Sequence, residues 1–409
     1  MFETDSRLNR FFSSVYVNAV VIFVAVLRFV QFGLNNCFSE SLEWQAYELC
    51  SDYSYGFIKR SLLGTLVSFL SSVTGMEFKK AVMVFMNAEE LIFSLALLGI
   101  LLCVINKYKN PNLNLLILFF LSTDVLGFYY SDWGEPDTVM ITLSLVMGLL
   151  IVREKFVWAV PILASVCALI HEGFAMMYFG MIVGLLLVQC IRKKGRGRLK
   201  FFTVLMVTGF MCGCLSAYCY FCTRLVINVS PEQLLSDAVQ KLGDGTNAKL
   251  LVANFWNVGA GIIQDGVPTF SFWLRMFAIA CACIILLPFI IYKFRFWRDL
   301  IKSENDKLMK LAYLLCSLVF LFALPLILTK ADEARWFYSV LLQEVMLINF
   351  LYMINKDRIK AGLSRFMKTS LFNVVLIGAY FLVFSNPNKQ FIDLVLVIIP
   401  YVMNWGPLL

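Results

Sequence analysis

Charged residues and histidine are scarce in this chain. Only 15% of its 409 residues are charged and a single one is histidine, whereas 60% are hydrophobic and 38 are phenylalanine. A soluble domain has about 25% charged and ~45–50% apolar residues. The shortage of charge therefore excludes a soluble enzyme, a disordered chain and a nucleic-acid-binding protein, and it indicates a polytopic membrane protein.

Linkers rich in glycine and serine, heptads and short-period repeats are absent as well, and no loop is long enough to hold a soluble domain. We therefore expect residues 1–409 to form a single membrane domain. A helix needs about 20 apolar residues to cross a bilayer, so the expected fold is all-α with about 11–12 transmembrane helices. The apolar runs lie near 15–36, 81–105, 112–130, 137–152, 156–171, 173–191, 201–223, 269–292, 311–328, 336–354, 369–385 and 391–406.

Lysine and arginine are unevenly distributed among the short connections, and such asymmetry sets the orientation of membrane proteins. Six alternate segments hold 2, 2, 2, 6, 6 and 5 of these residues, 23 of the 35 in the chain, but only seven of the 27 acids. The pattern predicts both termini on the cytoplasmic side of a cell (inner) membrane. The six segments are 1–14, 106–111, 153–155, 192–200, 293–310 and 355–368.

Two segments become extracytoplasmic loops in this topology. Residues 37–80 form the first loop, and 224–268 form the longest later one. Within the first loop, 57–76 is only moderately apolar, and counting it as a crossing would invert every later loop. We therefore interpret it as an amphipathic helix that lies at the outer face of the membrane or re-enters it.

Ionisable residues inside a bilayer are costly and usually functional. In the predicted topology they gather in the outer half of the membrane, which favours an enzyme or binding protein that meets its substrates there. A coupled transporter normally keeps its site near the midplane. The candidates are Glu48, Asp52, Tyr53, Tyr55, Lys59 and Arg60 in the first loop, Asp132, Glu135 and Asp137 after the third span, His171 and Glu172 in a hairpin, Arg335 before the tenth span, and Asn87, Glu89, Glu90, Asp124 and Glu344 at greater depth.

The acids and the histidine each allow two interpretations. Asp132, Glu135 and Asp137 either solvate a tight turn or hold a divalent cation or accept a proton from a sugar hydroxyl. His171 and Glu172 either cap their hairpin as a structural pair or contact the substrate.

The basic residues are equally open. Lys59 and Arg60 either anchor the loop at lipid headgroups or bind a phosphate group with their paired donors. Arg335 either is neutralised by Asp332 and Glu333 just before it or binds the phosphate together with the two cations of the first loop.

The order of these features resembles the multi-spanning glycosyltransferases of the GT-C superfamily. The shared layout is a first span, a long outer loop with an acid (Asp52) and an amphipathic helix, then Glu135-Pro-Asp137-Thr-Val-Met before an apolar helix, then the His171-Glu172 hairpin. The resemblance implies a polyprenyl-phosphate-linked sugar donor, an inverting displacement and an active site at the outer face. It also implies that Asp52 is the general base. That family often has two acids close together in this loop, whereas here Glu48 lies four residues from Asp52.

The chain is similar at lower resolution to the Wzy-type polymerases of O-antigen and capsule repeat units. Those proteins handle the lipid diphosphate with arginines of a large outer loop, and 224–268 stands in that place although it is nearly neutral. A glycolipid flippase, a membrane O-acyltransferase with His171 as its base and a purely structural subunit are further alternatives.

The favoured hypothesis is a glycosyltransferase of surface polysaccharide synthesis that acts outside the cytoplasm. Its partners would be a polyprenyl-(di)phosphate-linked sugar donor, a glycan or lipid-linked acceptor and the bilayer, with no nucleic acid. No cofactor is required beyond the optional divalent cation. The predicted catalytic residues are Asp52, Glu135, Asp137, His171 and Glu172, and the predicted substrate- and phosphate-binding residues are Tyr55, Lys59, Arg60, Asp132 and Arg335.

Overall fold

The computed structural model describes residues 6–37, 44–123, 125–243, 263–264, 267–268, 280, 287–323, 333–366 and 368–383. Within these ranges the chain is almost wholly helical, as predicted. One two-residue antiparallel pair, β1 (Ile263–Gln264) with β2 (Val267–Pro268), is the β-structure in the described part. The helices are α1 (Ser6–Phe12), α2 (Tyr16–Arg28), η1 (Phe29–Gly33), α3 (Leu34–Cys37), α4 (Trp44–Glu48), η2 (Tyr53–Tyr55), α5 (Ser61–Thr74), α6 (Phe78–Tyr108), α7 (Pro111–Ser122), α8 (Val125–Ser131), α9 (Pro136–Arg153), α10 (Ala159–Ile170), α11 (Phe174–Met177), α12 (Phe179–Arg192), α13 (Gly195–Val226), α14 (Pro231–Leu242), α17 (Leu287–Ser303), α18 (Lys307–Ser317), η3 (Val319–Phe322), α20 (Glu333–Ile354), α21 (Lys356–Phe366) and α22 (Leu371–Val383).

Among the described residues, five helical stretches are long and apolar enough to cross a membrane: 16–37, α6, 111–131, α9 and 195–223. Several shorter apolar helices accompany them, among them α10, α12 and α22. Large apolar side chains project from α13 without cover, with Phe210 and Phe221 more than 70% exposed. Helices that face lipid have this appearance, because lipid tails are as apolar as the side chains. The finding fits a polytopic helical protein.

Some predicted spans are interrupted helices rather than single ones. The first contains a π-helical turn, η1, between α2 and α3, and the third breaks after Ser122. The sixth is split at Tyr178 between α11 and α12. Most of 269–292, the end of 311–328 and all of 391–406 lie outside the described residues.

The chain divides into two compact units, each assembled from separated segments. Unit 1 comprises Met1–Gly33, Leu98–Phe128 and Gly261–Leu409, and unit 2 comprises Leu34–Leu97 and Tyr129–Ala260. In unit 1, α7 is completely enclosed and packs against α1, α2, α20 and α22. Its core is made of leucine, isoleucine and phenylalanine side chains such as Leu116 and Phe120, which are fully buried.

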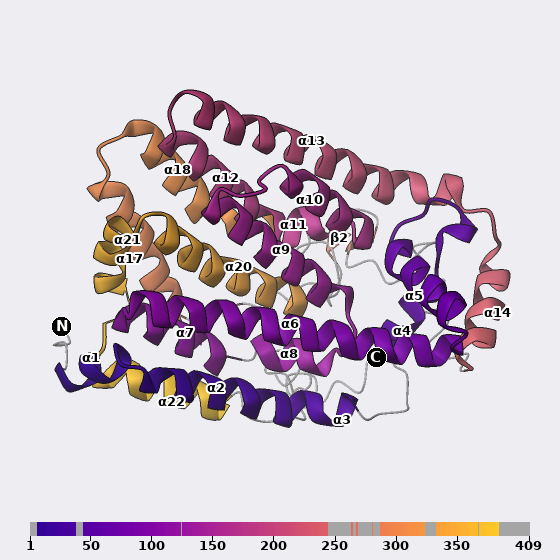
Figure 1. Ribbon diagram of the computed structural model, residues 1–409, viewed down its shortest axis with the longest axis horizontal. Coiled ribbons are helices and arrows are strands. Elements are labelled where there is room, and N and C mark those ends of the chain that lie inside the picture. The colour runs from indigo at the N-terminus through magenta and orange to yellow at the C-terminus, as the bar shows by residue number, and fades with distance from the viewer. Residues whose placement is uncertain are drawn as a thin grey trace. The chain divides into compact units, whose positions relative to one another are not determined.

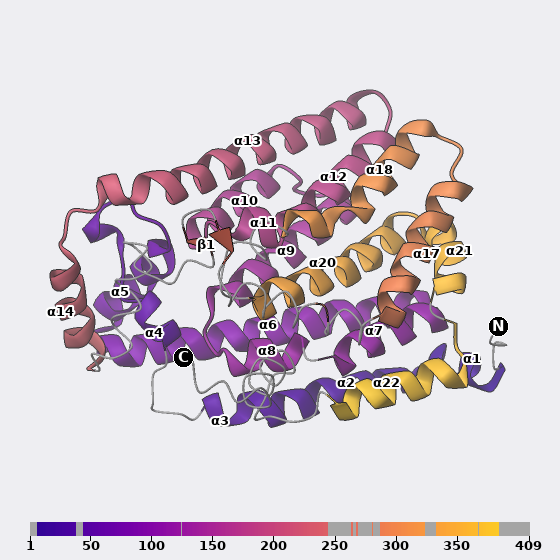
Figure 2. The same ribbon diagram turned by 180° about the vertical axis from the view of Figure 1, so that it is seen from behind.

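In unit 2, α10 lies between α9 and α13, and α12 packs against both of these helices (Figures 1 and 2). The chain passes from α9 to α10 and from α12 to α13 through short turns, so each of these pairs is antiparallel. Every predicted site residue except Arg335 belongs to this unit.

The segment 57–76 forms a helix, α5, of 14 residues. At 1.5 Å per residue it is about 21 Å long, which is short of the ~30 Å hydrocarbon core. Its apolar side chains Leu66, Phe69 and Val73 are exposed along one face, whereas Leu63 and Val67 are buried on the other. These dimensions agree with an amphipathic helix that does not cross the bilayer.

The long loop 224–268 contains a helix that we did not expect, α14. Ser230 caps its first turn by accepting a hydrogen bond from the Gln233 N–H, Pro231 occupies the first helical position, and Gly243 ends the helix with φ +96°. Leu234 and Ala238 are buried one turn apart. The helix is therefore amphipathic and packs its apolar side onto unit 2.

Candidate functional site

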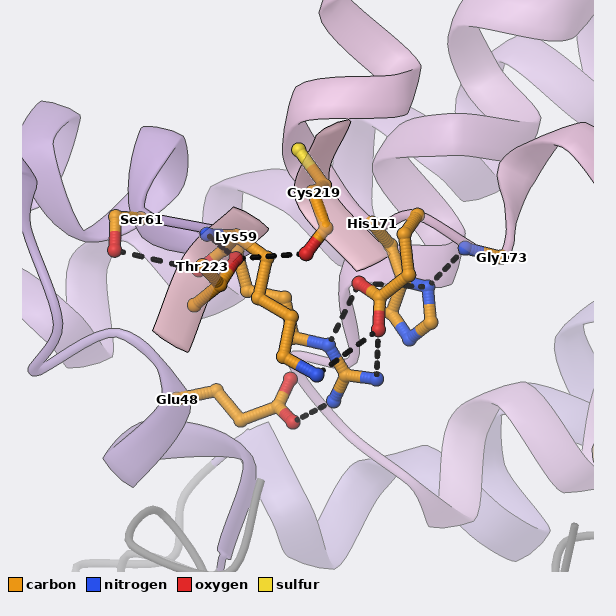
Figure 3. A network of polar contacts seen from close by, with 9 residues as sticks. Glu48, Lys59, Ser61, His171, Gly173, Cys219 and Thr223 are labelled. Carbon is orange, nitrogen blue, oxygen red and sulfur yellow. Dashed lines mark hydrogen bonds and ion pairs between the residues drawn. The ribbon is translucent and has the colours of Figure 1, made fainter. Parts of the chain in front are cut away.

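A buried group of charged side chains, the Glu172 cluster, joins three segments of unit 2 (Figure 3). It consists of Glu48, Lys59, Arg60, His171 and Glu172. Arg60 donates from Nε to Glu172 Oε2 and from Nη2 to Glu172 Oε1, both at 3.2 Å, and from Nη1 to Glu48 Oε1 at 2.8 Å. Lys59 Nζ lies 3.4 Å from Glu172 Oε1. Lys59, Arg60 and Glu172 were all predicted site residues, and the fold brings them into contact across 112 residues of sequence.

The local backbone explains how these side chains meet. Arg60 precedes α5 in the left-handed conformation, with φ 61° and ψ 6°, which is unfavourable for a residue with a side chain. The N–H of Lys59 donates to Thr223 Oγ1 of α13 at 3.1 Å. His171 ends α10 in an extended conformation, so Glu172 leaves the helix axis and faces the two cations. The cluster is thus fixed from α5, α10 and α13 together.

The Glu172 cluster balances its charges. Two cations, Lys59 and Arg60, face two carboxylates, Glu48 and Glu172. Burial alone would raise the pKa of Glu172, but the charges of Arg60 and Lys59 and the hydrogen bonds from Arg60 outweigh it and hold that pKa well below its usual value. Because all three donor nitrogens of Arg60 are bonded to carboxylates, a bound phosphate would have to displace one of these contacts.

The hydrogen bonds of His171 indicate its protonation state. Its Nδ1 accepts a hydrogen bond from the Gly173 N–H at 2.8 Å, so this nitrogen carries a lone pair. A histidine in that arrangement is neutral and has its proton on Nε2, an assignment made from the hydrogen bond. The 3.9 Å separation between His171 Nδ1 and Glu172 Oε2 is therefore not an ion pair.

Asp52 is the centre of a second group, the Asp52 cluster, with Ser54, Ser68 and Lys241. Its Oδ1 accepts from the Ser54 N–H at 2.9 Å and from the Ser54 hydroxyl, so it caps η2. Its Oδ2 accepts from Ser68 Oγ at 3.0 Å and from Lys241 Nζ at 3.5 Å. Burial alone would raise the pKa of Asp52, but the Ser54 bonds, Lys241 and Ser68 together leave it below its usual value. A substrate hydroxyl could give its proton to Asp52 only if one donor left.

Tyr55 connects the first loop to α14. Its hydroxyl donates to Asp237 Oδ2 at 2.9 Å, and its backbone carbonyl accepts from the Asn228 N–H at 3.1 Å. Burial, followed by the hydrogen bond to Asp237, raises the pKa of Tyr55. The predicted substrate-binding tyrosine is thus part of the contact that holds α14 in place.

Two glycines permit this arrangement. A Cβ on Gly64 of α5 would lie 1.8 Å from the Ser51 carbonyl oxygen, so only glycine lets α5 lie directly on the residues that precede Asp52. Gly56 has φ +108°, and a Cβ there would meet the Val226 carbonyl oxygen at 2.2 Å. Both close approaches involve backbone atoms, which cannot move aside as a flexible side chain can.

The sequence 134–138 forms the start of α9. Gly134 turns the chain with φ +81°, Glu135 is extended before proline, and Pro136 takes the first helical position. Asp137 lies in the first turn, where a carboxylate is favoured by the helix dipole. Tyr178 donates to Asp137 Oδ2 at 2.9 Å.

Two further acids, Glu89 and Glu90 of α6, point toward this turn. Glu89 accepts from the Thr138 hydroxyl, and Glu90 accepts from the Gly134 N–H at 3.3 Å. The other oxygen of each carboxyl group is buried and has no hydrogen-bond partner among the described residues. Glu135 is also buried, and Asp132 is partly exposed and accepts the Glu135 N–H through its carbonyl oxygen. The region is rich in acceptors, which suits a ligand that donates hydrogen bonds.

Polar groups occupy one end of unit 2 and basic loops the other. The first residues of α9, the last of α10 and the last turns of α13 are at the end that holds the two clusters. The other end carries Arg153, Lys155 and the sequence 192–200, in which six residues are basic. Because neighbouring helices in this unit are antiparallel, the predicted inner and outer loops do separate to opposite ends.

Arg335 stands apart from the other predicted residues because it belongs to unit 1, where it is buried in α20. Unit 1 has its own buried ion pair, in which Lys293 Nζ lies 3.0 Å from Glu344 Oε2 and Trp297 donates to the same carboxyl group. In the part of the chain that the structure describes, no group of three or more acidic, histidine or cysteine side chains is arranged to hold a metal ion.

Sequence reasoning missed Lys241, Asp237, Tyr178 and Thr138, which all contact predicted site residues. The signal for the first two was present, because a serine-proline start, a glycine end and a regular apolar spacing mark 230–243 as an amphipathic helix. Comparison with known proteins adds no relative: no family model, no curated protein and no solved structure matches this chain.

Proposed function

We propose that this chain is an integral membrane glycosyltransferase that uses a polyprenyl-phosphate-linked sugar donor at the extracytoplasmic face, in the synthesis of a surface glycan. The observation that carries the proposal is the polarity of unit 2. Its buried cations and acids gather at the end opposite the basic loops 153–155 and 192–200. By the positive-inside rule the basic end faces the cytoplasm, so the clusters face the outer leaflet, where polyprenyl-linked sugars are consumed.

The topology in this proposal has about 11–12 spans, with both termini in the cytoplasm of a cell (inner) membrane. The exposed apolar face of α5, with Leu66, Phe69 and Val73, lies in the outer interface. That placement sets the cations at the start of α5 at headgroup depth. A donor phosphate at this depth would keep its polyprenyl tail among the spans.

The roles of the residues follow the resemblance to GT-C enzymes. Asp52 accepts the proton of the acceptor hydroxyl while that oxygen attacks the anomeric carbon of the donor. Lys59 and Arg60 bind the phosphate and stabilise the charge that develops on the leaving group. The residues that bind the sugars in this proposal are Tyr55, Asp132, Glu135, Asp137, His171 and Glu172.

The acceptor-rich turn at the start of α9 supports sugar binding. The carboxyl groups of Glu89, Glu90 and Asp137 present acceptor oxygens, and sugar hydroxyls can donate hydrogen bonds to such oxygens. A divalent cation remains part of the proposal only as an option.

The alternatives fit the geometry less well. A repeat-unit polymerase would need free arginines in 224–268, whereas the cation of α14, Lys241, already contacts Asp52. A flippase would need polar groups at both ends of unit 2. An acyltransferase base would lie toward the cytoplasm, but His171 is at the end away from the basic loops.

Transfer of a radiolabelled sugar tests the proposal. The protein, purified in lipid nanodiscs, is offered a panel of polyprenyl-phosphate sugars with lipid-linked acceptors. We expect turnover of at least one donor, a loss of about 10²–10⁴-fold with Asp52→Asn and a large loss with Lys59→Gln. The matched control is Glu154→Gln, which breaks the Lys193–Glu154 pair at the basic end and should leave the rate unchanged.

Two results would contradict the proposal. The first is that no donor in the panel is used although the protein is folded. The second is that Glu154→Gln reduces the rate as much as Lys59→Gln, since the effect would then be structural. In either case, a flux assay for glycolipid in proteoliposomes becomes the next measurement.

A further inference from the structure

Lys241 is the most loosely held of the donors to Asp52. The Ser54 N–H and the Ser68 hydroxyl lie 2.9 and 3.0 Å from the carboxylate, whereas Lys241 Nζ lies 3.5 Å from Oδ2. A charge-assisted hydrogen bond between an ammonium and a carboxylate is normally 2.7–2.9 Å long. The side chain of Lys241 is also 25% exposed, against 13% for Asp52. Lys241 is therefore the donor that can leave Asp52 at least cost.

The other contacts of Lys241 are with one backbone carbonyl and two aromatic rings. Its ammonium donates to the Cys50 carbonyl at 3.0 Å and lies 5.0 Å from the ring centre of Phe78 and 5.5 Å from that of Tyr55. Aromatic faces attract a cation with little directional demand. The aromatic rings thus cover only part of the ammonium, which can turn toward solvent.

The helix that carries Lys241 does not depend on the contact with Asp52. The Tyr55 hydroxyl donates a hydrogen bond to Asp237, one turn before Lys241. Asn228 donates hydrogen bonds to the backbone carbonyls of Tyr55 and Ser54. Leu234 and Ala238 bury the apolar side of the helix. Because α14 is held by these groups, Lys241 can exchange its partner while the helix stays in place.

We propose that Lys241 is a ligand of the donor phosphate, and that its move from Asp52 to the phosphate frees the Asp52 carboxylate to act as the base. This inference rests on the proposed function and deepens it. In the resting protein Lys241 occupies Asp52. When the phosphodiester or diphosphate of the donor arrives, the ammonium exchanges one anionic partner for another, and Asp52 Oδ2 becomes accessible to the acceptor hydroxyl. Proton acceptance is thus linked to donor binding.

The bonds that change are few. The acceptor oxygen forms a bond to the anomeric carbon, and its proton passes to Asp52 Oδ2. The bond between the anomeric carbon and the phosphate oxygen breaks, and its electron pair stays on the phosphate. Lys241 then stabilises that charge together with Lys59 and Arg60. Atoms and charge balance without an oxidant or another reactant.

Among the residues that the structure describes, few charged or titratable groups lie around Asp52. From α14 they are Lys241 and Asp237, from the first loop they are Tyr55 and Cys50, and α5 presents only Ser68, because its sequence has no titratable residue. Burial raises the pKa of Cys50 to about 12, and the pKa of Tyr55 is raised as well. Neither group changes charge near neutral pH, so Lys241 is the cation among these groups whose departure would raise the pKa of Asp52.

The two acid limbs of the pH–rate profiles provide the test. The profile of kcat/KM reports the base in the free enzyme and that of kcat reports the base in the substrate complex. Since Lys241 lowers the pKa of Asp52 only in the free enzyme, the acid limb of kcat should lie at higher pH than that of kcat/KM. In Lys241→Gln the two limbs should coincide at the higher position, and the KM for the donor should rise about tenfold. Lys241→Arg should restore both properties.

A binding measurement separates this inference from the proposed function. Farnesyl phosphate and farnesol are titrated into the nanodisc-embedded protein, which requires no turnover. Lys241→Gln should lower the affinity for farnesyl phosphate about tenfold and leave the affinity for farnesol unchanged. Lys193→Gln at the basic end should change neither affinity. Equal affinity of wild type and Lys241→Gln for farnesyl phosphate, or limbs that already coincide in the wild type, would overturn the inference. Absence of transfer with an intact Lys241 effect on binding would instead reject the glycosyltransferase and retain the phosphate site.

Discussion

Replacement of Glu172 by glutamine tests whether the Glu172 cluster is a major source of stability. The carboxylate accepts two hydrogen bonds of 3.2 Å from Arg60 and lies 3.4 Å from Lys59 Nζ. Glutamine has the same shape but no charge, and one of its two terminal atoms becomes a donor that faces the cations. The substitution therefore removes the carboxylate charge that Lys59 and Arg60 share.

The expected loss follows from burial. Removing one member of a buried ion pair costs about 3–5 kcal/mol. The Glu172 side chain is 12% exposed and Arg60 is 17% exposed, and the glutamine oxygen still accepts one hydrogen bond, so we expect a loss of about 2 kcal/mol. The Lys193–Glu154 pair is shorter, at 2.7 Å, but its side chains are 32% and 37% exposed. Exposed pairs contribute about 0–1 kcal/mol. Glu154→Gln is therefore the control, because its pair is shorter but more exposed, and burial predicts that breaking it costs less.

The free energy of unfolding of both variants is measured in mixed micelles with increasing dodecyl sulfate, and unfolding is followed by far-ultraviolet circular dichroism. The pH dependence adds a signed check. The pKa of Glu172 is lowered in the folded protein, so its stabilisation is present above the usual value of 4.5 and is lost as the pH falls below it. The difference between wild type and Glu172→Gln should thus be largest at pH 7 and should shrink in acid. Equal losses for Glu172→Gln and Glu154→Gln, or a difference that grows in acid, would refute the reasoning.

Two further predictions concern packing and topology. Gly64→Ala should destabilise the protein by about 2–3 kcal/mol in the same unfolding assay, because its Cβ would overlap the Ser51 carbonyl, whereas Gly209→Ala, which has open space in α13, should be neutral or slightly stabilising; similar effects of the two would contradict the close approach. Cysteines introduced at Lys155 and at Gln233, in a protein cleared of reactive thiols, should react with a membrane-impermeant maleimide from opposite sides of sealed vesicles. Labelling of both from one side would reject the assignment of the basic end to the cytoplasm.

The helical part of the fold was predictable because it depends on local sequence. Apolar runs of the right length predicted helices at 81–105, 137–152 and 201–223, and these ranges lie within α6, α9 and α13. The amphipathic character of 57–76 was visible for the same reason, and α5 confirms the helix. Membrane placement was inferred from charge distribution, a property of the chain that no helix geometry tests.

The pairings within the site were not predictable, because they join residues far apart in sequence. The sequence near Arg60 does not indicate that Glu172 accepts its hydrogen bonds. In the sequence Asp52 is an available base, whereas in the structure it is bonded by Ser54, Ser68 and Lys241. Composition and spacing identify which residues are costly to bury. Only the packing of α5, α10, α13 and α14 determines which of them neutralise each other.

The left-handed backbone at Arg60 has a consequence for any attempt to redesign this protein. Judged by conformation alone, position 60 calls for glycine or asparagine, because a left-handed residue with a long side chain costs about 1–2 kcal/mol. Judged by its hydrogen bonds to Glu48 and Glu172, it calls for arginine and nothing else. A library guided by backbone conformation alone would therefore select against the side chain that organises the cluster. The unfavourable backbone conformation at position 60 is therefore maintained by the bonds of the side chain, and glycine or asparagine there would relieve the backbone but lose the contacts with Glu48 and Glu172.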